Sequence, residues 1–497
     1  MKNSIWMLLA LIFIGCTTDT STTEAAKETN NTVIIKGKID NYSPEKWTKE
    51  GVYVLPNYIT GKRPEYNFPI DSLGNYTLEF TVDYPTDIFL YNGKSMSLIV
   101  HPGDRFTTQF DASIPDEKDH LTATKIEGTH AQVNQQFLEY QSQVLPEYQI
   151  FQKNISEKST ETFRAYLDSI NTAKDHLIDT YIVDSETKPA LKNWLKAEKI
   201  VSSKSRILSY EGLYRMYTQK NPVLPSNYYD VIEPINTITE EMLINTHLSY
   251  DFGRDYTSFI RQETNKKYPD ASNSWKDFYP YFTKEILNRN RNNRLFAQLM
   301  INNWTHTTLE QQQLEYYESI QPILDSLYGE SIMGIALKSR YTNVKNMLDN
   351  PVLPEDTELL TFQSESPEAY LDEIIANAQG KVIYIDNWAT WCGPCKHEFK
   401  NSTPQLKEKF QKDVEFIYLC HQSEEKLWKP SIAEYKVTGK HYFLSQEESK
   451  PIFKQINLQG FPTYTIINKK GEIVTSGFEY RPSEAITSEI LTGLIAE

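Results

Sequence analysis

The chain has 497 residues, of which 39% are hydrophobic and 12% aromatic, and its formal net charge is −15. A chain of this length is too long for one hydrophobic core and predicts about three domains of roughly 100–200 residues each. The hydrophobic content excludes wholesale disorder. The acidic balance and the absence of a basic stretch exclude a nucleic-acid partner, because such binding depends on clustered Lys and Arg against phosphates.

Residues 1–16 have the pattern of a lipoprotein signal peptide. Lys2 is followed by the apolar stretch IWMLLALIFIG (5–15), which is shorter than the roughly 20 residues of a membrane span. The stretch ends in a small residue before Cys16, as in bacterial lipoproteins, where that cysteine is lipidated; Phe13 departs from the leucine usual in that motif. A plain secretory signal is the alternative. The polar residues 17–31 predict a flexible tether, so we expect a lipid-anchored protein of the bacterial cell envelope, facing the periplasm.

The segment 32–118 predicts an all-β module. Short β-rich runs such as TVIIKGKI (32–39) and GNYTLEFTV (74–82) are separated by turn signals such as YNGK (91–94) and HPGD (101–104). This spacing is typical of a β-sandwich or barrel. The segment contains no cysteine, and no cluster of histidine with acidic residues is expected there. We interpret it as a binding or spacer module.

The segment 130–350 predicts an all-α domain. Apolar residues recur at steps of three and four, as in a helix with one buried face, over the stretches 160–182, 188–209, 308–327 and 331–348. Tyrosine is common here. A tyrosine-rich groove for a ligand or an unfolded peptide is one reading, and ordinary packing between helices is the simpler one.

The segment 351–497 predicts an α/β domain with helices on both faces of a sheet. A buried strand (381–388) is expected to be followed by a helix (392–411), a second buried strand (414–420) and a second helix (423–436). After a further short strand and helix come a hairpin (461–479) that turns at 468–471 and a terminal helix (483–496).

The stretch WCGPCK (391–396) carries two cysteines at the start of the first of these helices. A helix that begins at Cys392 places this sulfur at the positive end of the helix dipole, where the thiol pKa falls and the reactive thiolate is favoured. Pro394 suits the first turn, and Lys396 adds a cation. Cys395 lies three residues on and can close a disulfide with Cys392. The pair is therefore asymmetric, with Cys392 as an exposed nucleophile and Cys395 as the shielded resolving thiol.

Two further features accompany the cysteines. Asp386 interrupts an apolar strand and shares a face with Tyr384 and Trp388. A carboxyl group there is expected to be partly buried with a raised pKa, which suits proton exchange with a thiol; a purely structural carboxylate is the alternative. The step GFPT (460–463) contains an X-Pro bond, the main place where cis peptides occur.

Together these residues carry a family resemblance. WCGPCK, with an aspartate six residues before its first cysteine and a Gly-x-Pro-Thr step about 65 residues later, resembles thioredoxin-fold proteins. It is most similar to the exported, membrane-tethered TlpA/ResA-like thiol–disulfide oxidoreductases. The resemblance covers about 140 residues. The β-rich segment is more weakly similar to modules that precede such domains in Bacteroidota-type lipoproteins.

The resemblance implies a role for each motif residue. Cys392 attacks a disulfide, Cys395 resolves the mixed disulfide, and Asp386 handles the proton. Pro462 is implied as a cis-proline facing the disulfide, and the residues implied in substrate binding beside it are Trp391, Phe461 and Thr463. The redox centre is then the Cys392–Cys395 disulfide, with no separate cofactor and no metal.

Two departures from the family pattern concern neighbouring positions. Asn387 stands where thioredoxins usually have an apolar aromatic residue. Cys420 is an extra thiol at the end of a strand predicted to be parallel to the one that leads to Cys392, so Cys420 and His421 are expected near the site. Cys420 is either a third thiol of the couple or an inert buried cysteine.

The same residues could in principle serve other functions. Zinc binding would recruit Cys392, Cys395, Cys420 and His421, but Gly-Pro between the first two cysteines favours redox chemistry. Haem attachment requires Cys-x-x-Cys-His, and Lys396 interrupts that pattern. The peroxidase motif Pro-x-x-x-Thr-x-x-Cys is absent from the sequence. The main alternative is a lipoprotein that binds a peptide or partner and uses the thioredoxin-like domain as a scaffold.

The direction of electron flow follows from the compartment. An exported dithiol must be kept reduced by a dedicated donor or act as an oxidant. Because Gly-Pro between the cysteines resembles reducing thioredoxins, we expect a reductase of exported protein disulfides, recharged by a membrane thiol-transfer protein.

Overall fold

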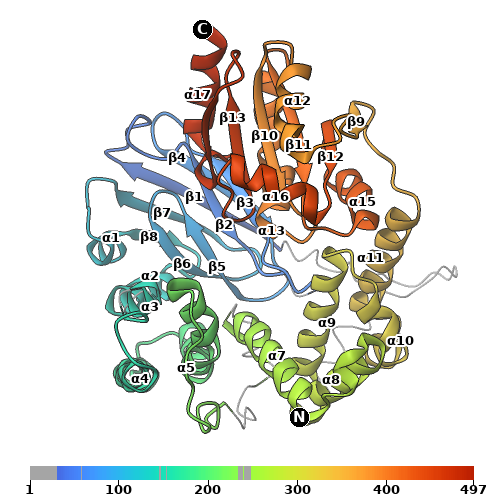
Figure 1. Ribbon diagram of the computed structural model, residues 1–497. Helices are drawn as coiled ribbons and strands as arrows, with labels where there is room; N and C mark the ends of the chain where they lie inside the picture. Colours follow the sequence, from blue (N-terminus) through green and yellow to red (C-terminus); the bar gives the residue numbers. More distant parts are fainter. Residues whose placement is uncertain (1–30, 58, 145–146, 153, 233–238, 240–247) are drawn as a thin grey trace, which may run out of the picture. The chain divides into compact units, whose positions relative to one another are not determined.

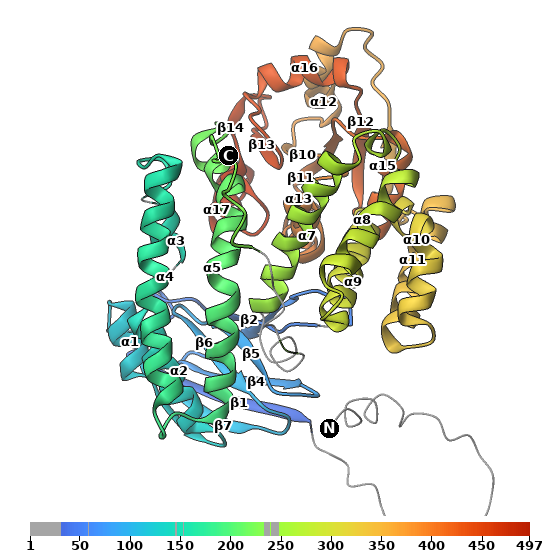
Figure 2. The ribbon, with the colours of Figure 1, turned by 90° about the horizontal axis from the view of Figure 1, so that it is seen from below.

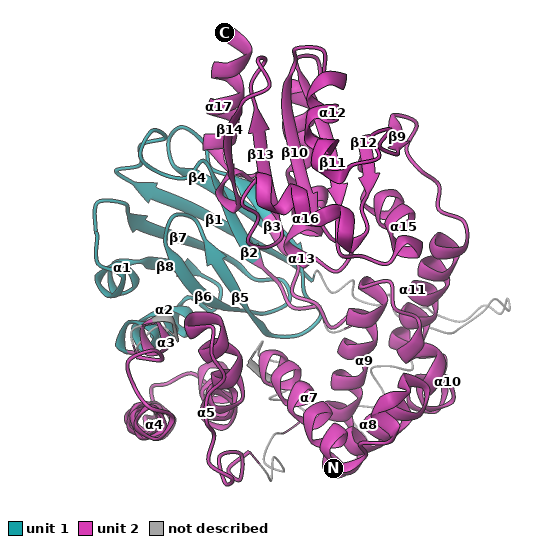
Figure 3. Ribbon diagram, in the orientation of Figure 1, with its two compact units in different colours: residues 1–53, 67–143 teal, residues 54–66, 144–497 magenta. Residues whose placement is uncertain are grey.

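The computed structural model describes residues 31–57, 59–144, 147–152, 154–232, 239 and 248–497. The expected lipidation site Cys16, its signal segment and residues 17–30 of the tether lie outside the described residues. The chain divides into two compact units, which are coloured separately in Figure 3. The first unit comprises residues 1–53 and 67–143, and the second comprises 54–66 and 144–497. None of the helices in the described ranges combines the length and the apolar character that crossing a membrane would require.

The first unit contains two four-stranded sheets, in the strand orders β4-β1-β7-β8 and β3-β2-β5-β6. Alternating side chains are buried along the strands, as in β4, where every second residue points into the core. The strands are β1 (Thr32–Asp40), β2 (Glu50–Val54), β3 (Glu65–Pro69), β4 (Asn75–Thr81), β5 (Thr86–Tyr91), β6 (Ser95–Val100), β7 (Arg105–Asp111) and β8 (Lys125–Gly128).

The first unit is not all-β and does not end at residue 118, in contrast to the expectation from the sequence. The helices α1 (Glu117–Ala123) and α2 (Ala131–Gln143) belong to it. The β8 strand pairs with β7. The Asn134 side chain in α2 accepts a hydrogen bond from the Ile99 N–H (2.7 Å) and donates one to the Ile99 carbonyl (2.9 Å). These contacts give hydrogen-bond partners to backbone groups of β6, the edge strand of its sheet. The helix α2 therefore belongs to the first unit.

A methyl group added at Gly37 in β1 is expected to destabilise the first unit. It would lie 1.8 Å from the Tyr76 ring, whose buried hydroxyl is held by Thr108 and Asn92 at 2.8 Å each. We expect Gly37→Ala to lower the free energy of unfolding by about 1–3 kcal/mol, measured by urea denaturation followed by circular dichroism. Gly212→Ala is the control, because no atom lies within 4 Å of that Cβ position; equal stability of the two variants would contradict the prediction.

From residue 144 onward, the second unit starts with a helical region. Its core is built from helix faces rich in Phe, Tyr, Ile and Leu, and the long helices α4 and α5 pack side by side (Figure 2). The helices are α3 (Glu147–Phe151), α4 (Thr160–Val183), α5 (Pro189–Thr218), α7 (Leu248–Lys267), the short 3-10 helix η1 (Ala271–Asn273), α8 (Trp275–Arg289), α9 (Arg294–Glu310), α10 (Glu315–Tyr328) and α11 (Ile332–Asp349).

Two details of the helical region bear on the sequence predictions. The expected helix at 308–327 is interrupted, because α9 ends at Glu310 and α10 begins at Glu315. Gln312 between them has a φ of 61°, which a right-handed helix does not accommodate. Many tyrosines, including Tyr210, Tyr256 and Tyr316, are fully buried in this core, as the packing interpretation predicts.

The C-terminal segment of the second unit contains a six-stranded sheet in the order β14-β13-β10-β11-β12-β9 (Figure 1). The central strand β10 pairs in parallel with β11 and antiparallel with β13. The strands are β9 (Thr357–Leu360), β10 (Val382–Trp388), β11 (Val414–Cys420), β12 (Gly439–Phe443), β13 (Thr463–Ile467) and β14 (Ile473–Gly477); the helices are α12 (Tyr370–Asn377), α13 (Gly393–Asn401), α14 (Thr403–Phe410), α15 (Glu425–Tyr435), α16 (Gln446–Gln455) and α17 (Ala485–Ala496), with short 3-10 helices η2 (Pro367–Ala369) and η3 (Phe478–Tyr480).

Helices cover both faces of this sheet, as the α/β prediction requires. One apolar cluster joins one face to α13, α14, α15 and α17, and a second joins the other face to α12 and α16. Successive residues of β10 point to opposite faces, so Asp386 lies on the α13 side and Asn387 on the α16 side. The helix expected at 392–411 is divided at Ser402 into α13 and α14, because Pro404 has no N–H with which to continue the first helix.

Candidate active site

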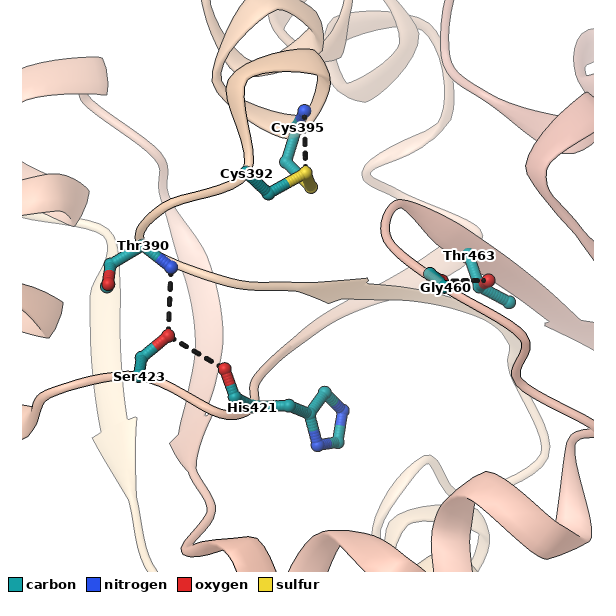
Figure 4. Close-up of a disulfide and its surroundings, with 7 residues drawn as sticks. All are labelled: Thr390, Cys392, Cys395, His421, Ser423, Gly460 and Thr463. Carbon is teal, nitrogen blue, oxygen red and sulfur yellow. Dashed lines mark hydrogen bonds between the residues drawn. A yellow bond between two sulfur atoms is a disulfide. The ribbon is translucent and has the colours of Figure 1, made fainter. Parts of the chain in front are cut away.

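The disulfide lies where the central strand passes into α13. Strand β10 is buried along its whole length, and Cys392 follows it as the N-cap residue of α13, with Pro394 in the first turn. Cys392 and Cys395 form a disulfide with their Cα atoms 5.3 Å apart, and the Cys395 N–H donates a hydrogen bond to the Cys392 sulfur at 3.2 Å (Figure 4). The expected placement of both sulfurs in the first turn of a helix is therefore present.

The expectation that Cys392 is exposed is wrong. Cys392 is only 3% exposed and Cys395 is fully buried, so the first cysteine is not an exposed residue in this disulfide-bonded form. Both belong to the apolar cluster that includes Trp388. The Lys396 ammonium lies 5.9 Å from the centre of the Tyr435 ring. Burial lowers the pKa of Lys396, and the carboxylates of α9 and α15 act against that shift.

Asp386 is a buried carboxyl group beneath the site. It is 1% exposed, and neither of its oxygens has a hydrogen-bond partner among the described residues. Burial, followed by the charge of Glu398, raises the pKa of Asp386 well above its usual range. Glu398 itself accepts hydrogen bonds from Ser483, at 3.1 Å from the backbone N–H and 2.8 Å from the hydroxyl. Asp386 is therefore a buried acid with a raised pKa, six residues before Cys392.

The residues expected to bind substrate lie on two loops that meet through their aromatic rings. The Trp391 ring is 59% exposed and contacts the Phe461 ring edge-on at a centroid distance of 5.7 Å. The Phe461–Pro462 peptide bond is cis. The Thr463 hydroxyl donates to the Gly460 carbonyl at 2.7 Å and closes this loop (Figure 4). An exposed aromatic surface beside the disulfide therefore exists.

Cys420 and His421 end the strand next to β10. Cys420 lies opposite Trp388 in the strand register, forms no disulfide and is fully buried. Burial raises the pKa of the Cys420 thiol to about 12, so it stays protonated at neutral pH and is a poor nucleophile. The His421 ring is also fully buried.

Hydrogen bonds that the sequence did not indicate join the loop after β11 (residues 421–423) to the loop before Cys392 (residues 389–391). The Ser423 hydroxyl donates to the His421 carbonyl at 2.7 Å and accepts a hydrogen bond from the Thr390 N–H at 2.9 Å (Figure 4). The Trp391 indole N–H donates to the Gln422 carbonyl at 2.7 Å. No periodicity or motif marks residues 422 and 423, because their importance depends on the fold bringing β11 beside the disulfide loop.

A cluster of histidine with an acid forms at the edge of the expected β-rich segment, because His130, which lies beyond residue 118, joins His101 and Asp104. His101, Asp104 and His130 bring one potential ligand atom each to within 4.8 Å of one another. Fold contacts explain the cluster: Asp104 accepts hydrogen bonds from the His101 N–H at 2.8 Å and from His130 Nδ1 at 2.7 Å. Burial acts to raise the pKa of Asp104, but these hydrogen bonds outweigh it and lower the pKa. The sequence missed this cluster because β8 carries His130 back to the turn at residues 101–104.

The C-terminal segment is similar to known proteins. Residues 373–494 match the redoxin family. The thiol-disulfide oxidoreductase ResA of Bacillus subtilis is 24% identical over 123 residues, which are 24% of this chain and 67% of ResA. The thioredoxin-like protein YneN of Bacillus subtilis is 27% identical over 99 residues, 20% of this chain and 57% of YneN. Among solved structures, the thioredoxin domain of a thiol-disulfide oxidoreductase from Bacteroides vulgatus is 18% identical with a TM-score of 0.22, over 24% of this chain and 83% of that one. The C-terminal segment is a redoxin domain of the thiol–disulfide oxidoreductase type.

Proposed function

We propose that this chain is a membrane-tethered reductase of disulfides in exported proteins, working through Cys392 and Cys395. The observation that carries the proposal is the disulfide in the first turn of α13, with the buried carboxyl group of Asp386, whose pKa is raised, on the strand that leads to it. The redoxin match and the likeness to ResA support the same chemistry.

The reaction needs two exchanges. In the reduced enzyme the Cys392 thiolate attacks one sulfur of a substrate disulfide, the substrate S–S bond breaks, and a substrate thiolate leaves. Cys395 then loses its proton and attacks the Cys392 sulfur, which releases the second substrate thiol and forms the Cys392–Cys395 disulfide. Two electrons pass to the substrate in total. Asp386 exchanges the proton of the resolving thiol, and the helix N-terminus stabilises the Cys392 thiolate.

The location and the electron donor are parts of the proposal. The lipoprotein pattern that ends at Cys16 supports an anchored protein of the bacterial envelope that faces the periplasm. In that oxidising compartment the enzyme requires continual re-reduction, and we assign this step to a membrane thiol-transfer protein. The exposed ring of Trp391 next to Phe461 supplies a surface on which an exported polypeptide docks.

The reduction potential tests the direction of the reaction. The full chain, with Cys16→Ser so that this thiol does not interfere, is equilibrated in glutathione buffers and the two-electron couple is measured. A value near roughly −270 mV is expected for a reductase, and one near about −120 mV would identify a disulfide donor instead.

Cys420→Ala in the same measurement tests the third thiol. Because burial raises the Cys420 pKa to about 12, we expect this substitution to leave the potential unchanged. A shifted potential would make Cys420 a member of the couple.

A further inference from the structure

The pair formed by Asn387 and His421 lies on the sheet face opposite α13 and yet contacts the loop 460–463. Both side chains are fully buried. Asn387 is opposite Thr463 in the antiparallel register of β10 and β13, and its amide N–H donates to the Thr463 carbonyl at 3.0 Å. His421 Nε2 lies 3.1 Å from Asn387 Oδ1. A continuous hydrogen-bonded path therefore leads from the end of β11 to the loop that carries Phe461.

The proton positions on this path follow from its ends. The Thr463 carbonyl can only accept, so Asn387 turns its N–H toward Thr463 and its oxygen toward His421. Nε2 of His421 therefore carries the ring proton, and Nδ1 lies 2.9 Å from the hydroxyl oxygen of Ser449 in α16, which donates to the Ser445 carbonyl at 2.8 Å. Burial lowers the His421 pKa to about 3, so the ring is neutral at physiological pH.

The same histidine contacts Phe461 of the docking surface and the end of the strand that leads to the disulfide loop. Its ring stacks on the Phe461 ring at a centroid distance of 5.7 Å and an angle of 17°. Its backbone N–H donates to the Trp388 carbonyl at 2.9 Å, immediately before the disulfide loop. The two residues after His421 bond to the same loop: the Gln422 carbonyl accepts from the Trp391 indole, and the Ser423 hydroxyl accepts from the Thr390 N–H, as Figure 4 shows for Ser423.

We propose that Asn387 and His421 are positioning residues that set the loop 460–463, and with it Phe461, relative to the Cys392–Cys395 disulfide. This inference rests on the proposed function. In this proposal the pair is needed for substrates in which the disulfide belongs to a polypeptide, because the polypeptide chain extends over the surface of Trp391 and Phe461. A small disulfide that reaches Cys392 without touching the loop does not depend on the pair.

The test compares these two kinds of substrate. The full chain with Cys16→Ser is assayed for reduction of insulin, with dithiothreitol as the electron source, and for the reaction of the reduced enzyme with dithionitrobenzoate. The variant is the double substitution Asn387→Leu and His421→Leu, which removes both partners of the hydrogen bond between these side chains, whereas either single substitution would also leave one of the two side chains without its partner. His120→Leu is the matched control, since it replaces another fully buried histidine in the first unit.

We expect the double variant to raise the KM for insulin about tenfold, with kcat within about twofold and an unchanged rate with dithionitrobenzoate, while His120→Leu changes none of these values. An unchanged KM in the double variant would overturn the positioning role. A parallel loss with both substrates would overturn it too, because the pair would then support the dithiol itself. If the unsubstituted chain reduced neither substrate, the proposed function would fail, a result distinct from both of these.

Discussion

Replacing Cys392 by serine is expected to lower the rate of insulin reduction to about one thousandth or less of that of the unsubstituted chain. The hydroxyl of serine is a much weaker nucleophile than a thiolate in the first turn of a helix, and loss of a nucleophile removes the covalent step altogether. The assay is turnover of insulin with dithiothreitol, with Cys16→Ser in every sample. Cys420→Ala is the control, because that buried thiol is protonated at neutral pH.

Cys395→Ser distinguishes the two cysteines in the same assay. It leaves the attacking sulfur in place and removes the resolving one, so a mixed disulfide with the substrate is expected to accumulate. Retention of full activity in Cys392→Ser would disprove the exchange mechanism. The alternative, a partner-binding protein with a thioredoxin-like scaffold, requires that its function survive both substitutions.

Asp386→Asn is expected to slow insulin reduction about a hundredfold and to stabilise the fold at the same time. The slower rate follows from the loss of a group that accepts and returns the thiol proton. The gain in stability follows from removing the free energy that protonating this buried carboxyl group costs at pH 7, because burial raises its pKa well above the usual range, and we expect about 1–3 kcal/mol. Both effects are measured on one preparation, by turnover and by urea denaturation.

The pH dependence of this stability has a definite sign. The pKa of Asp386 in the folded chain is raised, first by burial and then by the Glu398 charge, whereas in the unfolded chain it lies near about 4. The folded state therefore holds the proton more tightly. The stabilisation that this protonated group contributes is complete below about pH 4 and is lost as the pH rises from there toward the folded pKa. The advantage of Asp386→Asn over the unsubstituted chain should accordingly grow from pH 4 to pH 8. Asp413→Asn, at an exposed position, is the control, and an advantage that shrank with pH would contradict the buried-acid assignment.

The sequence by itself determined the elements that depend on local chemistry. A nearly continuous apolar run defined β10 and its neighbour β11, because a central strand is buried on both faces. The spacing of Cys392, Pro394 and Cys395 determined the helix start and the disulfide, since all three lie within one helical turn. Asp386 was identified as a candidate because a carboxyl group in an apolar strand has few explanations other than function or a buried hydrogen bond.

The tertiary structure alone decided the features that depend on distant segments. The boundary expected at residue 118 lies before the end of the first unit, because β8 and α2 provide hydrogen-bond partners for the backbone of strands that lie tens of residues earlier. The burial of Cys392 depends on packing within a cluster drawn from several helices. The path from His421 through Asn387 to Thr463 joins three strands that the sequence separates, and only their register brings a histidine, an amide and a carbonyl into line. Local propensity carries no information about such register, because it is set by which strands pair and by the faces that they bury.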